Sequence, residues 1–294
     1  MRTSGTGPKN TVDGSSQKVG GPSGSRRTQL FYDEQGWTEN DGQLIDLELF
    51  GTKEDGPIRI ELHETFQQRI HDAIATAGSD IDLLECGCGG SPEVSLLDLC
   101  STYTGIDFSD TGLKQAARQL EAAAVIHDLQ KADVCNLPFA DDRFDAVYSA
   151  RMIFHIPDPA AQARAVSEML RVVKPGGVAV IITANPFPLL FPERSLKRIV
   201  ALTPVLGPVA NRLRPTPPLP YEPMSLRWFK RQIGDKGAVD MISNGLPSTA
   251  FNQRVSEFST VGKRLWQLLR WVEISFPRGS VPLGNYTQIT VTKH

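Results

Sequence analysis

The sequence lacks three features that would indicate its function directly. They are a large excess of charge of one sign, a high content of cysteine and long hydrophobic runs. Its 31 basic and 33 acidic residues leave a formal net charge of -2, so it lacks the positive excess with which many proteins bind nucleic acid. The apolar runs are interrupted, as at Asn185-Pro186, and none reaches the roughly 18 residues that a membrane-spanning helix needs. We therefore expect neither a nucleic-acid partner nor a transmembrane segment.

The four cysteines are too few for a disulfide scaffold in a chain of 294 residues. Cys86 and Cys88 lie two positions apart, too close for an easy bridge, and no second ligand pair offers the spacing of a zinc site. The N-terminal segment also lacks the apolar stretch of a secretory signal. We expect reduced cysteines, no bound metal and a cytoplasmic location.

Residues 1–28 have the composition of a disordered tail. Seventeen of these 28 residues are Gly, Ser, Pro or Thr, and few apolar side chains are present to offset the entropy lost on folding. Residues 29–78 predict an N-terminal helical cap. Its main helix covers Ile60–Ala77, where apolar residues recur on one helical face.

Residues 79–185 alternate short apolar strands with amphipathic helices. Strands are predicted at Ile81–Glu85, Tyr103–Asp107, within Val125–Ala132, at Phe144–Ser149 and at Val178–Thr183. Helices are predicted from Pro92, after Ser109 as N-cap, and from Asp158-Pro159 to a stop at Gly176-Gly177. This alternation favours a Rossmann-like α/β fold, with a mostly parallel sheet covered by helices on both faces.

Residues 186–236 break the alternation with many prolines, and they carry nine basic side chains against three acidic ones. They predict an inserted cap, or lid, over a site, with a helix at Ser225–Ile233. The alternative is peripheral contact with a membrane surface. Residues 237–294 are expected to complete the sheet with a strand at Ala238–Ser243, a helix from Val261 and a closing strand at Tyr286–Thr292.

Three polar positions follow successive strands of this predicted sheet. Glu85-x-Gly87-x-Gly89 leaves the first strand, and its glycines allow a tight turn and a close approach of backbone to a ligand. Asp107 ends the second strand, where a carboxylate can accept both hydroxyls of a ribose. Asp133 follows the third strand, where its carboxylate can accept a hydrogen bond from an exocyclic amine. Open sheets bind ligands at the carboxyl ends of their strands, so these residues predict a nucleoside site.

These residues and their surroundings resemble the class I S-adenosylmethionine-dependent methyltransferases. The resemblance is carried by Leu83–Gly90, Tyr103–Ser109, Asp133–Phe139, Phe144–Ser149 and Leu170–Gly177. The resemblance covers roughly residues 80–184. Within the family, the sequence looks most like the small-molecule branch that includes quinone-biosynthesis enzymes. The sequence departs from the family's third glycine, because Ser91 stands there and Gly90 precedes it.

The resemblance implies a seven-stranded sheet whose last strand is antiparallel, and S-adenosyl-L-methionine as cofactor. It implies that Glu85, Gly87 and Gly89 shape the cofactor site, that Asp107 holds the ribose and that Asp133 meets the adenine amine. Val134 and Ser149, in two of the matching segments, are further expected cofactor contacts. In similar enzymes the N-terminal segment covers the cofactor, which makes Tyr32 a candidate contact to the methionine end; packing in the core is the alternative for Tyr32.

His155 is the candidate catalytic base, because it lies in the loop after the fourth strand, where the family often has histidine. The alternative is a structural histidine hydrogen-bonded to backbone. We predict methyl transfer by in-line displacement to a small, apolar acceptor, which includes lipid-like molecules. The competing hypotheses are a nicotinamide-dependent oxidoreductase of Rossmann type and a non-catalytic protein that binds a nucleoside cofactor.

Overall fold

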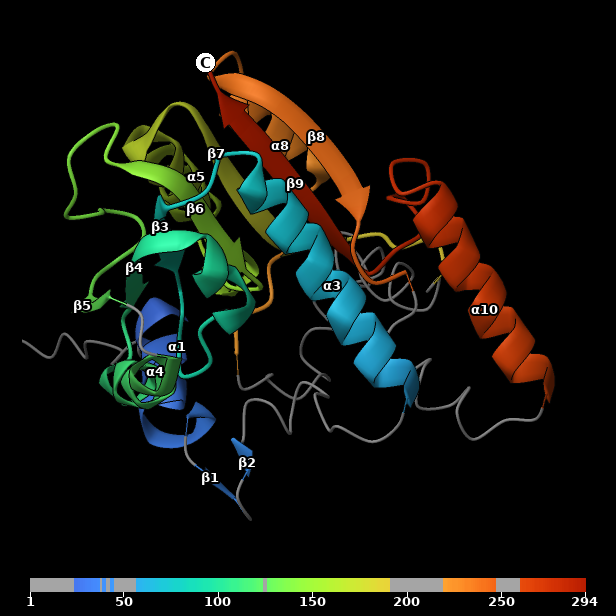
Figure 1. The fold of residues 1–294 in the computed structure, drawn as a ribbon, viewed down its shortest axis with the longest axis horizontal. Coiled ribbons are helices and arrows are strands. Elements are labelled where there is room, and N and C mark those ends of the chain that lie inside the picture. The colour runs from blue at the N-terminus through green and yellow to red at the C-terminus, as the bar shows by residue number, and fades with distance from the viewer. Residues whose placement is uncertain are drawn as a thin grey trace, which may run out of the picture.

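The computed structural model describes residues 24–37, 39–40, 43–44, 57–123, 126–190, 219–246 and 260–294. A seven-stranded sheet forms its centre (Figure 1). In spatial order the strands are β5 (His127–Lys131), β4 (Cys100–Asp107), β3 (Ile81–Cys86), β6 (Phe144–Ala150), β7 (Val173–Ala184), β9 (Tyr286–Lys293) and β8 (Gly237–Ser243). β9 runs antiparallel to both of its neighbours, and the pairs from β5 to β7 are parallel. This confirms the predicted sheet and its antiparallel last strand.

Helices cover both faces of the sheet, as predicted. Alternate strand residues point to opposite faces, so Leu83 and Leu84 belong to different buried clusters. The cluster of Leu83 is closed by α3 (Pro57–Ala75), η2 (Val94–Leu99) and α4 (Asp110–Ala123). The cluster of Leu84 is closed by α5 (Pro159–Val172) and α8 (Leu226–Ile233). The short η3 (Ile153–His155) follows β6.

Local capping explains where several helices begin. Asp158 accepts hydrogen bonds from the N–H groups of Ala160 and Ala161 at the start of α5. The Ser225 hydroxyl accepts from the N–H of Trp228 at the start of α8, and the Ser109 hydroxyl accepts from the N–H of Gly112 in α4. These three starts were predicted from the sequence.

The predicted end of α5 is wrong. α5 ends at Val172 rather than at Gly176-Gly177, and both glycines lie within β7. Pro175 lacks a backbone N–H and disfavours helical geometry at Lys174, so the helix ends before it. A Cβ on Gly177 would lie 2.5 Å from the Asp145 carbonyl oxygen, so glycine allows β7 to pack closely against β6. The helix predicted to start near Pro92 is the 3-10 helix η2, which begins at Val94.

The N-terminal elements are α1 (Gly24–Phe31), η1 (Tyr32–Gly36) and the short pair β1 (Glu39–Asn40) and β2 (Gln43–Leu44). α1 contradicts the prediction that residues 24–28 belong to a disordered tail. Tertiary contacts override the weak local propensity there, because Thr28 and Phe31 are buried. Residues 1–23 of the predicted tail, and 191–218 of the predicted lid, lie outside the described residues.

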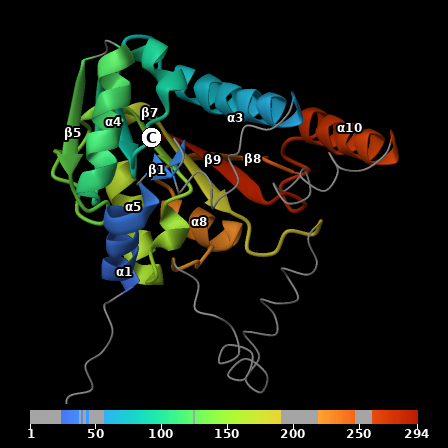
Figure 2. The same ribbon diagram turned by 90° about the horizontal axis from the view of Figure 1, so that it is seen from below.

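α10 (Thr260–Ser275) is the last helix of the chain. In both ribbon views α3 and α10 extend beyond the sheet on the same side (Figures 1 and 2). Within the described residues, no helix has the length and apolar character needed to cross a membrane.

Candidate functional site

The turn that contains Gly87 and Gly89, here called the glycine turn, follows β3. It lies at the point where the strand order reverses, because β4 and β5 lie on one side of β3 and β6 lies on the other. Gly87 has φ +76° and Gly89 has φ +53°, a region that L side chains rarely adopt. A Cβ on Gly87 would lie 2.7 Å from Met152 Cγ. The N–H groups of Gly87 and Cys88 both donate to the Ile106 carbonyl, at 2.8 and 3.1 Å. The turn therefore requires glycine and is held against β4.

Asp107, at the end of β4, closes this corner. Its Oδ2 accepts from the N–H of Gly89 at 3.0 Å, and its Oδ1 accepts from the N–H of Ser109 at 2.8 Å. Burial raises the pKa of Asp107 to about 6, against the lowering effect of these hydrogen bonds. Each carboxylate oxygen has a second lone-pair direction, so this group can accept from additional donors such as sugar hydroxyls.

Glu85 lies beneath the turn and is almost entirely buried. Its Oε2 accepts from the N–H of Glu93 at 3.0 Å and from the hydroxyl of Tyr103 at 2.7 Å. Burial raises the pKa of Glu85 to about 8, so the neutral acid predominates at pH 7. Glu85 thus anchors the start of the loop that leads to η2, in its protonated form.

Asp133 and Val134 follow β5, next to the end of β4. The N–H of Ala132 donates to the Asp107 carbonyl at 3.1 Å, which joins the two strand ends. Asp133 is exposed, and its Oδ1 accepts from the N–H of Cys135 at 2.8 Å within its own turn. Val134 is half-buried against the core cluster of Leu84. The expected contact of Asp133 with adenine stays a prediction.

Ser149, near the end of β6, is buried, and its hydroxyl donates to the Cys86 carbonyl at 2.9 Å. It therefore links β6 to the last residue of β3, immediately before the glycine turn. The structure brings together the turn, Asp107 and Ser149 at one edge of the sheet, with Asp133 at the adjoining strand end.

Aromatic side chains from η1 and its end cover the turn. Tyr32 stacks on Trp37, with ring centroids 5.3 Å apart, and contacts Phe108 edge-on at 6.4 Å. Trp37, rather than Tyr32, lies against the glycines, because Cβ atoms built on Gly89 and Gly90 would meet its indole ring at 2.1 and 2.8 Å. Sequence reasoning missed this role of Trp37.

Two polar atoms of the same segment are buried without a hydrogen-bond partner within the described part of the chain, Trp37 Nε1 and Asp33 Oδ1. The charge of Asp33 also contributes to the raised pKa of Asp107, which places the two carboxylates near each other. Buried polar atoms without partners cost free energy, so they indicate a polar ligand or water at this position. An adenosyl group, with its sugar hydroxyls and ring nitrogens, fits this set of donors and acceptors. No sequence pattern singled out Asp33.

His155 ends η3, in the loop that follows β6. Its Nδ1 lies 2.7 Å from the Pro220 carbonyl oxygen, and because a carbonyl can only accept, Nδ1 carries the proton. Burial lowers the pKa of His155 below its ordinary value. The neutral ring then holds its basic lone pair on Nε2, which is compatible with both the catalytic and the structural hypothesis.

Residues 84–181 match the family described as methyltransferase domain. A demethylmenaquinone methyltransferase of Desulfitobacterium hafniense (strain Y51) is 39% identical over 101 residues, 32% of this chain and 38% of that protein. A 2-methyl-6-phytyl-1,4-hydroquinone methyltransferase of Synechocystis sp. is 36% identical over 118 residues, 38% of this chain and 36% of that protein. The match thus spans little more than a third of each of these curated relatives.

A solved structure shares the fold over most of the chain. It is a geranyl diphosphate C-methyltransferase from Streptomyces coelicolor A3(2), in complex with Mg²⁺, geranyl diphosphate and S-adenosyl-L-homocysteine. The TM-score is 0.56 at 15% sequence identity, and the alignment covers 93% of this chain and 99% of that chain. The two chains therefore share their architecture far beyond the segment that the family model matches.

Proposed function

We propose that this chain, whose residues 84–181 match the methyltransferase domain family, is a class I S-adenosylmethionine-dependent enzyme that transfers a methyl group to a small, apolar acceptor. The observation that carries the proposal is the corner formed by Gly89 and Asp107. A carboxylate that is buried, hydrogen-bonded to the turn and placed at the strand end suits the sugar of an adenosyl group. The family match supports this function and does not favour the nicotinamide-dependent oxidoreductase.

The proposal includes the other cofactor contacts expected from the sequence. Asp107 accepts hydrogen bonds from the ribose hydroxyls. Asp133 accepts one from the adenine amine through Oδ2, since its Oδ1 accepts from the N–H of Cys135. Val134 packs against the adenine ring. Tyr32 and Trp37 cover the glycine turn and keep water away from the bound cofactor.

Bound S-adenosylmethionine supplies a methyl group on a positively charged sulfur that leaves as a neutral thioether, so no residue has to protonate the leaving group. The chain has to hold the acceptor in line with that methyl group and exclude water, and such positioning is worth roughly 7–11 kcal/mol. His155 Nε2 takes the proton of an acidic acceptor, because the hydrogen bond to Pro220 holds the ring in the required tautomer.

The relatives indicate which class of acceptor to expect. Those named above are methyltransferases of demethylmenaquinone and of a phytyl hydroquinone, both apolar molecules. We propose an acceptor of this apolar kind, including lipid-like molecules, and no nucleic-acid partner. We also propose a cytoplasmic location, since the four cysteines are all free thiols.

The test is transfer of tritium from methyl-labelled S-adenosylmethionine into an organic extract, with a panel of apolar quinols and phenols as acceptors. We expect label in at least one acceptor, and a matched loss in Asp107→Asn. If a protein that binds the cofactor labelled none of them, the non-catalytic binding protein would be the better explanation.

A further inference from the structure

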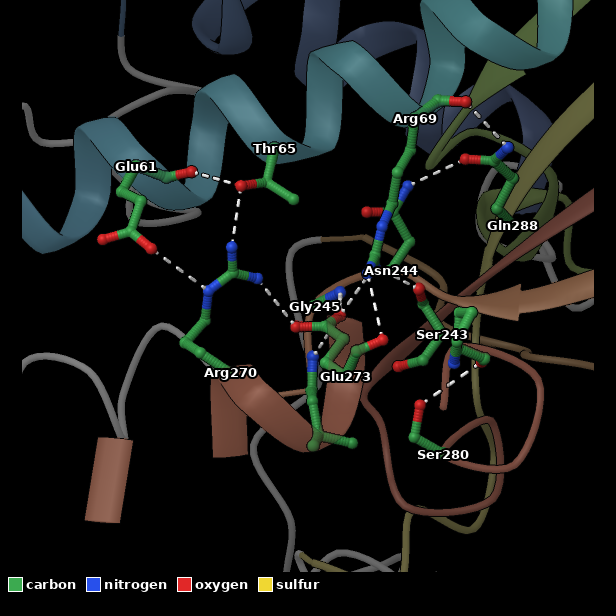
Figure 3. Close-up of polar contacts among 12 residues, drawn as sticks. Glu61, Thr65, Arg69, Ser243, Asn244, Gly245, Arg270, Glu273, Ser280 and Gln288 are labelled. Atoms are coloured by element: carbon green, nitrogen blue, oxygen red, sulfur yellow. Dashed lines mark hydrogen bonds and ion pairs between the residues drawn. The ribbon is translucent and has the colours of Figure 1, made fainter. Parts of the chain in front are cut away.

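The inner face of α10 is fastened to the body by a buried ionic network (Figure 3). Glu273 accepts from Arg69 and Arg270 at 3.1 and 3.0 Å, and from the N–H groups of Gly245 and Leu246 at 2.7 and 3.0 Å. The side chains of Glu273 and Arg270 are only 1% and 5% exposed. α10 is thereby tied to α3 and to the loop after β8, so its opposite face points outward in a defined orientation.

That opposite face is apolar and exposed. Four large side chains recur every three or four residues along it, the spacing of one helical face. They are Val261, Leu265, Leu268 and Trp271, and Ile274 and Phe276 extend the apolar surface beyond them. All six are between 44% and 75% exposed. A row of exposed apolar side chains that lie together on one face points to an interaction site.

The charges of α10 are distributed unevenly. Lys263 and Arg264 are exposed on the helix. The one acidic residue of α10, Glu273, is buried in the network described above. The exposed part of the helix therefore carries two positive charges and no negative one, beside an apolar face that includes tryptophan. This combination is typical of helices that lie in the interface of an anionic membrane.

A second exposed apolar segment is hydrogen-bonded to the loop that follows α10. Phe187, Leu189 and Leu190 are exposed, and the N–H groups of Leu189 and Leu190 donate to the carbonyls of Pro282 and Leu283, in the loop after α10. This segment follows Ala184, the last residue of β7. It therefore lies near the carboxyl edge of the sheet, where the glycine turn and Asp107 also lie.

We propose that the exposed face of α10, with Phe276 and residues 187–190, docks onto the surface of a membrane that contains anionic lipids. A second copy of this chain fits the face less well. Two such faces packed together would bring Lys263 and Arg264 of each copy against a helix with no exposed acid, so neither pair of charges would be matched. Anionic headgroups match these charges, and the acyl region accommodates Trp271 and Leu268.

The test is cosedimentation of the full chain with vesicles of phosphatidylcholine, with and without phosphatidylglycerol. We expect binding that depends on phosphatidylglycerol. Each basic side chain near an anionic surface contributes about a fivefold gain, so Lys263→Gln with Arg264→Gln should lower the partition coefficient about 30-fold. Leu268→Gln with Trp271→Gln should also lower binding to the vesicles that contain phosphatidylglycerol.

The matched control is Ile126→Gln, which changes an apolar residue that is even more exposed than Leu268 and Trp271, just before β5 at the opposite edge of the sheet. It should bind vesicles as the wild type does, and all variants should keep the wild-type circular dichroism and cofactor affinity. Two results overturn the proposal: vesicle binding that is absent or insensitive to the α10 variants, or self-association in light scattering that Leu268→Gln with Trp271→Gln abolishes. The inference is independent of methyl transfer, so it can fail or succeed separately.

Discussion

Glu85→Gln should remove a pH dependence of stability that the buried carboxyl imposes. Glutamine has nearly the shape of the protonated acid, and both hydrogen bonds from Glu93 and Tyr103 end on a single oxygen, Oε2. The amide oxygen of glutamine can therefore take over both of them. The substitution thus changes the titration of this position while leaving its contacts in place.

The magnitude follows from the pKa of Glu85, about 8 in the folded protein against an ordinary value of 4.5. Because the folded value is raised, the native state keeps its proton over a range in which the unfolded state has lost it. The stability contribution is complete below pH 4.5 and is lost as the pH rises to about 8. At about 1.4 kcal/mol for each pH unit the whole loss is about 5 kcal/mol, of which about 2 kcal/mol falls between pH 6 and pH 8.

Urea denaturation of the wild type and of Glu85→Gln at several pH values measures this difference. We expect the stability of Glu85→Gln relative to the wild type to increase by about 2 kcal/mol from pH 6 to pH 8, and to change little above pH 9. Glu64→Gln, on the exposed surface of α3, controls for removal of a carboxyl charge. A relative stability that stays constant from pH 6 to pH 8 would refute the assignment of a neutral Glu85.

Three further substitutions test the glycine turn, the buried network of Glu273 and the role of His155. Gly87→Ala should lower the free energy of unfolding by about 1–3 kcal/mol, because φ is +76° and Met152 is close; an unchanged urea midpoint would contradict the turn geometry. Glu273→Gln should cost about 3–5 kcal/mol in the same assay, since two guanidinium groups lose their carboxylate, and a loss below about 1 kcal/mol would speak against a buried network. His155→Gln should lower kcat about 10²- to 10⁴-fold with an unchanged KM for S-adenosylmethionine, whereas a structural histidine would leave kcat within a few-fold.

Sequence periodicity predicted most of the regular elements of the chain. The sheet with β9, the starts of α5 and α8, and α10 were expected where they lie, because their apolar residues follow the helix or strand period. The corner of Gly89 and Asp107 was also foreseeable, since both follow strands that a parallel sheet brings together.

Contacts between distant segments could not be derived in this way. Trp37 packs against glycines more than fifty residues away, and Asp33 lies near Asp107, although neither position belongs to a periodic pattern. α1 forms within a sequence of low helical propensity because Thr28 and Phe31 find buried positions in the folded protein. The protonation of Glu85 likewise depends on burial, which a list of strand residues does not reveal.

Calorimetric titration of the wild type, Asp107→Asn and Asp107→Ala with S-adenosylhomocysteine measures whether Asp107 binds the adenosyl group. We expect the wild type to bind in the micromolar range and not to bind NAD. Each hydrogen bond from a ribose hydroxyl to a charged acceptor is worth about 1.5–3 kcal/mol, so both variants should bind at least tenfold more weakly. Equal affinities of the wild type and the two variants would contradict the assignment of Asp107 to the adenosyl group.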